Sequence, residues 1–545
     1  NDEAYDAFYK ATWSAAWTSA SYFSLAEIAS SRGDYRAALG FLDRSLAMNA
    51  WNTRAMNLKG TVLRKLGRGE EARRLLDEVA AFDPLDVRTL AERSLSASDP
   101  KAAQALRAAL AAHPATGLET AVEYGNAGLY EDAMEVLREM QAASPDRPQV
   151  SPMVYYLLGW YAGRLGATDK AAGYYELAAK ASPDYSFPFQ MEMIPVFRGA
   201  MKVNPEDARA PYYLANLLFD HQPEEAVRLW EAARSVDPSF AIVHRNLALA
   251  YQRQPNGLLK AIAGMEKAVS LSPDDPMFLF ELDKMYEAAG ASLEKRLAVL
   301  DKHDATVTKR DDVLSRAIQL RVQAGQYDRA IELLKGRHFH IWEGGVRFGV
   351  HDSWVDAHLL RGHQRMAGKD YAGALADYQA ALEYPQNLES ARPLRGGRLP
   401  ETNYFVGLAH EALGDGTKAR EAWKQAAAHP LGSDEDPEPT VAEGADMFYW
   451  QARSLEKLGE KAKASAMYAR LVEMGVAAMK EREGVDFFAK FEGRVAASAR
   501  KAQAHYIAGL GYLGRNEKNK AKDEFTQALK LDGFHLAAKS RLASL

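Results

Sequence analysis

The chain of 545 residues contains no cysteine, which excludes disulfides, thiolate metal sites and cysteine nucleophiles. It also lacks an uninterrupted apolar run of the roughly 18 residues that a membrane-spanning helix needs. An excess of positive charge is absent as well, since 68 lysines and arginines stand against 73 aspartates and glutamates and give a net charge of −5. The composition therefore offers no basic footprint of the kind that binds nucleic acid.

A secretory signal is missing too, because no basic residues followed by an apolar segment open the chain. Residues 1–8 instead resemble the second helix of a helical hairpin whose preceding turn is absent. We therefore expect the sequence to begin inside a repeat array, as a piece of a longer protein. It indicates no cellular compartment.

What the chain does have is an internal repeat. Gly33 and Gly67 open similar segments 34 residues apart, which is the period of the tetratricopeptide repeat (TPR). Glycine suits a turn between paired helices because it tolerates positive φ, and the glycines that mark such turns are Gly33, Gly67, Gly128, Gly166, Gly325, Gly368, Gly414 and Gly459. Proline ends a helix because it lacks the amide donor, and the prolines that follow second helices are Pro84, Pro114, Pro145, Pro183, Pro205, Pro238 and Pro273.

Between these marks, apolar residues recur every three or four positions, as in a helix that packs along one face. The alternation typical of strands is nowhere sustained. Small residues in first helices, such as Gly60, Gly159 and Gly407, are expected to let the partner helix approach closely. The pattern predicts an all-α, TPR-type α-solenoid of about fourteen antiparallel helix pairs in a right-handed superhelix.

Breaks in the rhythm divide the chain into four expected parts. They are an N-terminal TPR array at 1–182, a middle array at 183–335, an inserted aromatic and histidine loop at 336–355, and a C-terminal TPR-like array with long loops at 356–545. The middle array starts with an irregular half-repeat, because Pro183 and Pro205 are only 22 residues apart. This half-repeat carries the aromatic segment Tyr-Ser-Phe-Pro-Phe at 185–189, followed by one helix.

The inserted loop holds the strongest candidate for a ligand site. Its candidate residues are His338, His340, Trp342, Glu343, His351, Asp352 and Trp354. Indole faces stack on sugars or flank cations, a carboxylate beside imidazoles suits acid–base work, and two histidines two positions apart can reach one metal ion. The leading interpretation is that the loop packs across the groove and fastens two arrays. Ligand binding by these residues is the second interpretation, and we assign no catalytic residue, no metal and no cofactor.

Familiar catalytic signatures are missing from the sequence. It contains no phosphate loop, no His-Glu-x-x-His and no Gly-x-Ser-x-Gly elbow. Gly509, Gly511 and Gly514 match a dinucleotide-binding pattern by letter. No strand is predicted before them, so we expect them to pack helices. Chemistry contained within this chain is therefore disfavoured.

Several segments go beyond a generic repeat. They lie at 5–14, 211–220, 244–251, 280–286, 337–345 and 382–388, and the most specific are Tyr-Lys-Ala-Thr-Trp at 9–13 and Trp-Glu-Gly-Gly at 342–345. Together they resemble the C-terminal TPR half of a bacterial family of large proteins, whose members carry an uncharacterised β-rich domain before the repeats. The resemblance implies an array that supports such a domain, and, by analogy with sugar-binding sandwiches, a link to carbohydrate.

Two functions follow. The first is a TPR scaffold that mediates protein–protein interaction or positions an upstream domain, since a stacked array offers a long concave surface. The alternative is a carbohydrate-related protein in which the solenoid supports a sugar-binding or glycoside-processing domain and the inserted loop contacts the ligand. Expected partners are another protein, the chain's own missing N-terminal region, or carbohydrate. The aromatic N-terminus also predicts self-association, whereas neither nucleic acid nor a membrane span is expected.

Overall fold

The computed structural model describes residues 2–97, 100–143, 151–340, 349–431, 439–441, 444–480 and 497–545. Thirty α-helices and one 3-10 helix make up this described part, and it contains no β-strand beyond an isolated bridge between Thr440 and Gly444. The predicted all-α TPR-type solenoid is therefore confirmed. Contacts divide the chain into two compact units, residues 1–253 and 254–545. The four-part division by sequence stays a prediction.

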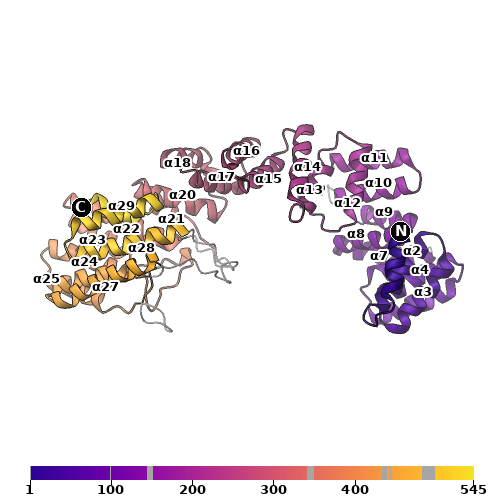
Figure 1. Ribbon diagram of the computed structural model, residues 1–545, viewed down its shortest axis with the longest axis horizontal. Helices are drawn as coiled ribbons and strands as arrows, with labels where there is room; N and C mark the ends of the chain where they lie inside the picture. Colours follow the sequence, from indigo (N-terminus) through magenta and orange to yellow (C-terminus); the bar gives the residue numbers. More distant parts are fainter. Residues whose placement is uncertain are drawn as a thin grey trace. The chain divides into compact units, whose positions relative to one another are not determined.

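Consecutive helices of the first unit pair with one another along the chain (Figure 1). They are α1 (Asp2–Ala11), α2 (Thr18–Ser31), α3 (Tyr35–Met48), α4 (Thr53–Lys65), α5 (Gly69–Phe82), α6 (Val87–Ala97), α7 (Pro100–Ala112), α8 (Pro114–Asn126), α9 (Tyr130–Ala142), α10 (Pro152–Arg164), α11 (Thr168–Lys180), α12 (Met193–Val203), α13 (Arg209–Leu218), α14 (Pro223–Val236) and α15 (Ala241–Gln252). Helix α12 is the single helix of the predicted half-repeat.

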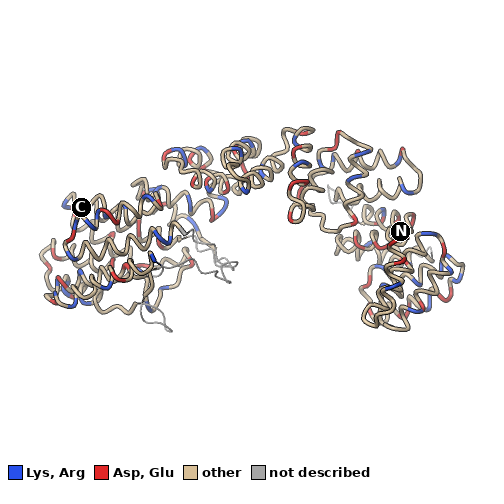
Figure 2. Tube along the Cα trace, viewed as in Figure 1, with Lys and Arg blue, Asp and Glu red and all other residues tan. Residues whose placement is uncertain are grey.

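The second unit continues the same pairing. Its helices are α16 (Leu258–Leu271), α17 (Pro276–Ala288), α18 (Leu293–Lys302), α19 (Asp304–Val307), α20 (Asp311–Gln323), α21 (Tyr327–Lys335), α22 (Val350–Ala367), α23 (Tyr371–Ala380), η1 (Gln386–Leu388), α24 (Leu399–Ala412), α25 (Gly416–Ala428), α26 (Met447–Leu458), α27 (Lys461–Lys480), α28 (Ala497–Gly514), α29 (Lys518–Leu531) and α30 (Leu536–Ala543). None of the described helices combines the length and the apolar character needed to cross a membrane. In Figure 2, acidic and basic residues are interspersed along the described helices of both units.

Turn chemistry follows the sequence closely. At Gly33 the backbone has φ +76°, and the next residue, Asp34, caps α3 by accepting a hydrogen bond from the amide of Ala37 at 2.9 Å. Such a cap satisfies one of the amides that a helix start leaves without a partner. One predicted turn differs, because Gly368 has φ −78° and Lys369 takes the left-handed conformation at φ +62°. The turn needs one left-handed residue, and here it falls one position later.

Small residues in first helices do face large residues of second helices. A Cβ atom added at Gly159 would lie 2.7 Å from the ring of Tyr175, and one at Gly407 would lie 2.2 Å from Trp423 Nε1. Among the dinucleotide-like glycines, Gly509 behaves in the same way, since a Cβ there would lie 2.5 Å from the ring of Phe525, whereas Gly511 and Gly514 pack against Val472 and Tyr468 of α27. Each of these glycines lies within a helix (α10, α24 or α28) and faces atoms of a neighbouring helix, which confirms the prediction that they pack helices.

Candidate protein-interaction site

The start of the predicted loop is anchored at Phe339, which lies between the two described histidines. The side chain of Phe339 is 2% exposed, and its amide donates to the carbonyl of Asn387 at 2.8 Å. Asn387 Nδ2 in turn donates to the carbonyls of Leu334 and Arg337, at 2.8 and 2.7 Å. This asparagine, in the 3-10 helix η1, fastens the end of α21 to the segment that follows it. Asn387 lies in the segment 382–388, to which the sequence analysis gave no structural role.

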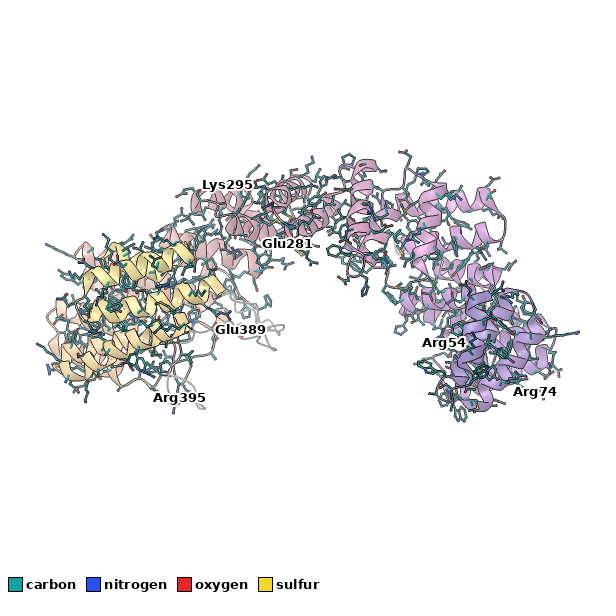
Figure 3. The ribbon with its side chains drawn as sticks, in the orientation of Figure 1. Arg54, Arg74, Glu281, Lys295, Glu389 and Arg395 are labelled. Atoms are coloured by element: carbon teal, nitrogen blue, oxygen red, sulfur yellow. The ribbon has the colours of Figure 1, made fainter. Side chains whose placement is uncertain are left out.

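Each of the two histidines contacts a carboxylate. His338 Nε2 lies 2.9 Å from Oε1 of Glu389, which is labelled in Figure 3. His340 meets Asp311 through its backbone amide at 2.9 Å and through Nδ1 at 3.0 Å. The side chains of His338 and His340 stay 62% and 70% exposed. Both imidazoles are thus oriented by carboxylates and open to solvent.

Asp311 is the main anchor of this segment. Besides the contacts with His340, it accepts a hydrogen bond from Arg337 Nε at 2.7 Å. These hydrogen bonds lower the pKa of the Asp311 carboxyl, although burial opposes them. A carboxylate that accepts several hydrogen bonds is held in its charged form. Asp311 opens α20, and its place at a helix start is the signal that could have identified it.

The other five candidate residues differ in their burial and in whether the structure describes them. Trp342 and Glu343 lie outside the described residues. His351, in α22, stacks on Tyr384 with ring centroids 3.9 Å apart, and burial lowers its pKa. Asp352 is exposed on the same helix.

Trp354 is 2% exposed, and its Nε1 donates to the carbonyl of Ala380 at 2.9 Å. A buried indole with a satisfied donor packs α22 against α23 and offers no open ring face. Among the described residues, no group of three or more histidine, aspartate or glutamate side chains is arranged to hold a metal ion. A ligand-binding role for the seven candidates stays a prediction.

A second polar cluster lies inside the second unit. Arg398, just before α24, contacts Glu401 at 2.6 Å and also contacts Asp356 of α22. Arg541 of α30 lies over the ring of Trp450 at 4.5 Å and reaches within 4.0 Å of Glu401. Helices far apart in sequence therefore share one ion-pair network.

The carboxyl of Asp446, at the start of α26, belongs to the same region. Burial is the main cause that raises its pKa to about 6, Glu401 adds to the rise, and Arg398 opposes it. A cavity of about 10 Å³ lies nearby and is lined by Arg398, His351, Tyr384 and their neighbours. This cavity holds about one water molecule, so it has no room for a small-molecule ligand. The role of the ion-pair network is to join helices of the second unit.

The first unit holds a comparable arrangement. Glu27 of α2 is half-buried, and burial, with a smaller contribution from Glu123, raises its pKa to about 7 against the opposing effect of Arg54. Arg54 of α4, labelled in Figure 3, forms an ion pair with Glu123 of α8 at 2.8 Å. The turn after α8 also approaches α2, because a Cβ at Gly128 would lie 2.5 Å from Ser31 Cα. Sequence reasoning missed Glu27, although a glutamate between apolar residues was a visible signal.

Two first helices of the same unit carry linked amides. Asn246 Nδ2 in α15 donates to Asn216 Oδ1 in α13 at 3.1 Å, and the same oxygen accepts from Trp230 Nε1 at 3.0 Å. Both asparagines are half-buried. Because Asn216 Oδ1 already accepts two hydrogen bonds, these amides would bind backbone carbonyls of a polypeptide through their N–H groups, of which each amide carries two.

Comparison with known proteins agrees with this architecture. Tetratricopeptide repeat models match residues 29–93 and 154–185. Among solved structures, MamA from Desulfovibrio magneticus RS-1 is 22% identical, with 36% of this chain and 95% of that one covered and a TM-score of 0.21. The Naa15/Naa10 complex bound to HypK-THB is 14% identical, covers 99% and 93%, and has a TM-score of 0.26.

YrrB, described as a TPR protein with an unusual peptide-binding site, is 16% identical, with coverages of 44% and 95% and a TM-score of 0.17. At scores this low, no functional argument rests on the structural likenesses. The repeat matches and the array of helix pairs carry the conclusion. The chain contains tetratricopeptide repeats and is an all-α, TPR-type helical protein, which supports a role as a protein-interaction scaffold.

Proposed function

We propose that the chain is a scaffold that binds a protein ligand along its first helices and performs no chemistry of its own. The observation that carries this proposal is the presence of tetratricopeptide repeats in a chain built of helix pairs. Repeat arrays of this kind bind extended partners along one continuous face. No comparison supports the carbohydrate alternative, so the proposal does not include it.

The linked amides of Asn216 and Asn246 are the part of this face that a substitution can test most cleanly. They lie on α13 and α15, two successive first helices, and a ligand backbone that crosses both helices would meet them in turn. Losing such a hydrogen bond to a ligand typically weakens binding by about 1 kcal/mol. The pair Asn216→Ala/Asn246→Ala is therefore expected to lower affinity about tenfold or more.

The experiment begins with affinity capture from source-cell extract by the full chain, and each captured protein is then purified and titrated by calorimetry. The matched control is Glu225→Ala/Arg228→Ala, which removes an exposed ion pair on the second helix α14. We expect the asparagine variant to lose affinity and the control to keep it. The proposal is wrong if every captured protein binds both variants as tightly as the unsubstituted chain.

The aromatic N-terminus supports a second role. Trp13 and Trp17 are 79% and 64% exposed, and Trp13 lines a shallow hollow together with Tyr5 and Tyr9. Exposed aromatic side chains gathered in this way are characteristic of a contact with other protein. We infer that this surface self-associates. In the bacterial family that the chain resembles, the same surface would instead cover preceding repeats, which would position the β-rich domain.

Light scattering after size-exclusion chromatography separates these two uses. Self-association predicts a mass that rises with protein concentration and returns to the monomer value in Trp13→Ser/Trp17→Ser. Trp51→Ser, which removes an indole that is 66% exposed elsewhere in the unit, is expected to leave association unchanged. A mass that stays monomeric at every concentration would contradict self-association and would favour contact with preceding repeats.

A further inference from the structure

The half-repeat of the first unit carries an unusual exposed segment. Between α11 and α12, where the chain order calls for a first helix, residues 183–192 form no helix. Four large apolar side chains of this segment are exposed, namely Tyr185 at 95%, Phe187 at 77%, Phe189 at 68% and Met191 at 68%. Contiguous exposed apolar groups of this kind are characteristic of interaction sites.

Exposure alternates along the segment. Ser186 is buried, and Pro188 and Gln190 are half-buried, whereas the residues on either side of each are exposed. Alternation with a period of two is the pattern of an extended strand, in which successive side chains point to opposite faces. Within the stretch 186–190, Phe187 and Phe189 therefore share the outward face. Tyr185, with a left-handed backbone at φ +56°, and Met191 lie in the turns on either side of this stretch.

The backbone of this segment has unused hydrogen-bonding groups. Among the described residues, neither the amides nor the carbonyls of Phe187 and Phe189 take part in a hydrogen bond. In a strand, residues two apart direct these groups toward the same edge. Pro188 lies between them and has no amide donor, but its position belongs to the opposite edge, where proline is tolerated. One edge is thus complete and unpaired.

Charge flanks the apolar face on both sides. Asp184 precedes it and Glu192 follows it, both are exposed, and residues 185–191 contain no charged side chain. A partner of complementary character has apolar residues opposite the segment and basic residues beyond each end.

From these observations we propose that residues 185–191 bind an extended peptide of another protein, which adds to the Phe187–Phe189 edge as a β-strand. The peptide has an apolar side chain at every second position and a lysine or arginine on each flank. Main-chain hydrogen bonds provide affinity in this mode, and alternate side chains provide specificity. The inference rests on the proposed scaffold function and names the class of ligand that one surface takes.

The test uses a phage-displayed library of random peptides, selected on the full chain. The selected peptides are then synthesised and titrated against Phe187→Ser/Phe189→Ser. The control, Leu259→Ser/Leu394→Ser, removes two leucines that are 76% and 90% exposed elsewhere. We expect the selected peptides to show the alternating apolar pattern with basic flanks. They should bind the phenylalanine variant about tenfold or more weakly and the control unchanged.

Hydrogen exchange supplies a second readout, since strand addition should protect the amides of Phe187 and Phe189 when peptide is bound. The inference is overturned if the peptides bind the phenylalanine variant at full strength, or if these amides exchange as fast with peptide as without. It is also overturned if the library yields no peptide, or if the segment pairs only with a second copy of the chain. Peptides that depend on Asn216 and Asn246 instead would overturn the inference and leave the scaffold function standing.

Discussion

Glu27 provides the sharpest prediction, because its carboxyl is held in an environment that disfavours its charge. It lies on α2 near Arg54 and Glu123, and burial is the main cause that raises its pKa from 4.5 to about 7. A folded-state pKa above the unfolded value means that the folded chain keeps a proton that the unfolded chain has released. Replacement by glutamine, which has nearly the same shape and no charge, isolates this effect.

The sign and the size follow from linkage. Between pH 4.5 and 7 the folded state binds more protons at Glu27 than the unfolded state, so the free energy of unfolding falls as pH rises. With about 1.4 kcal/mol per pKa unit, the loss reaches about 3 kcal/mol above pH 7. Glu27→Gln is therefore expected to change nothing at pH 4. At pH 8 it is expected to stabilise the first unit by up to about 3 kcal/mol.

Hydrogen exchange of the full chain measures this effect locally, which suits a repeat protein whose parts open separately. Peptides from α2 and α8 should exchange more slowly in Glu27→Gln at pH 8, after correction for intrinsic rates, and equally at pH 4. The control Glu71→Gln removes an exposed carboxyl paired with Arg68 and should leave α2 unchanged at both values. Equal effects of Glu27→Gln at pH 4 and pH 8 would refute the reasoning, because a packing change has no reason to depend on pH.

Two further predictions concern packing and buried charge. Gly159→Ala should lower the free energy of unfolding by about 1–3 kcal/mol, because the added Cβ would lie 2.7 Å from Tyr175. Gly163→Ala lies four residues along the same helix, where the nearest atom would be 3.8 Å from the added Cβ, and should raise the free energy of unfolding by up to about 1 kcal/mol. Urea unfolding followed by circular dichroism measures both changes. Equal effects of the two substitutions would contradict the argument from these distances. Asp283→Asn should lower the free energy of unfolding by about 3–5 kcal/mol. Asp283 and its partner Arg296 are each 2% exposed, so the substitution would leave the buried arginine without its counter-charge. Thermal unfolding measures this loss, and a shift no larger than that of an exposed substitution would show that the pair is not desolvated.

The sequence predicts well those contacts that recur in every repeat. Gly159 against Tyr175 and Gly407 against Trp423 join the first and second helices of one pair, so a fixed spacing of about 16 residues identifies them. Gly509 against Phe525 follows from the same rule, whereas Gly511 and Gly514 pack against the preceding helix α27. Helix content and turn positions follow as well, because glycine, proline and apolar spacing act locally.

Contacts between distant repeats are not predictable in this way. The ion pair of Arg54 with Glu123 and the approach of Gly128 to Ser31 depend on how tightly the array winds. Winding accumulates from small rotations between neighbouring repeats, and no single residue fixes it. The same reason explains why Asp311 and Asn387 escaped notice, since each anchors a segment that is distant in sequence.

The regular repeats and the irregular segments contribute differently to this protein. A repeat that satisfies every spacing rule buries its apolar residues against its neighbours and leaves few to bind anything else. Where the spacing fails, at residues 183–192, four large apolar side chains remain exposed and one backbone edge, at Phe187 and Phe189, remains unpaired. Exposing such groups is unfavourable in water, so their presence calls for a compensating contact. Binding through apolar side chains is therefore expected at the interruptions of the array, while the regular repeats hold those interruptions in place and contribute polar groups such as Asn216 and Asn246.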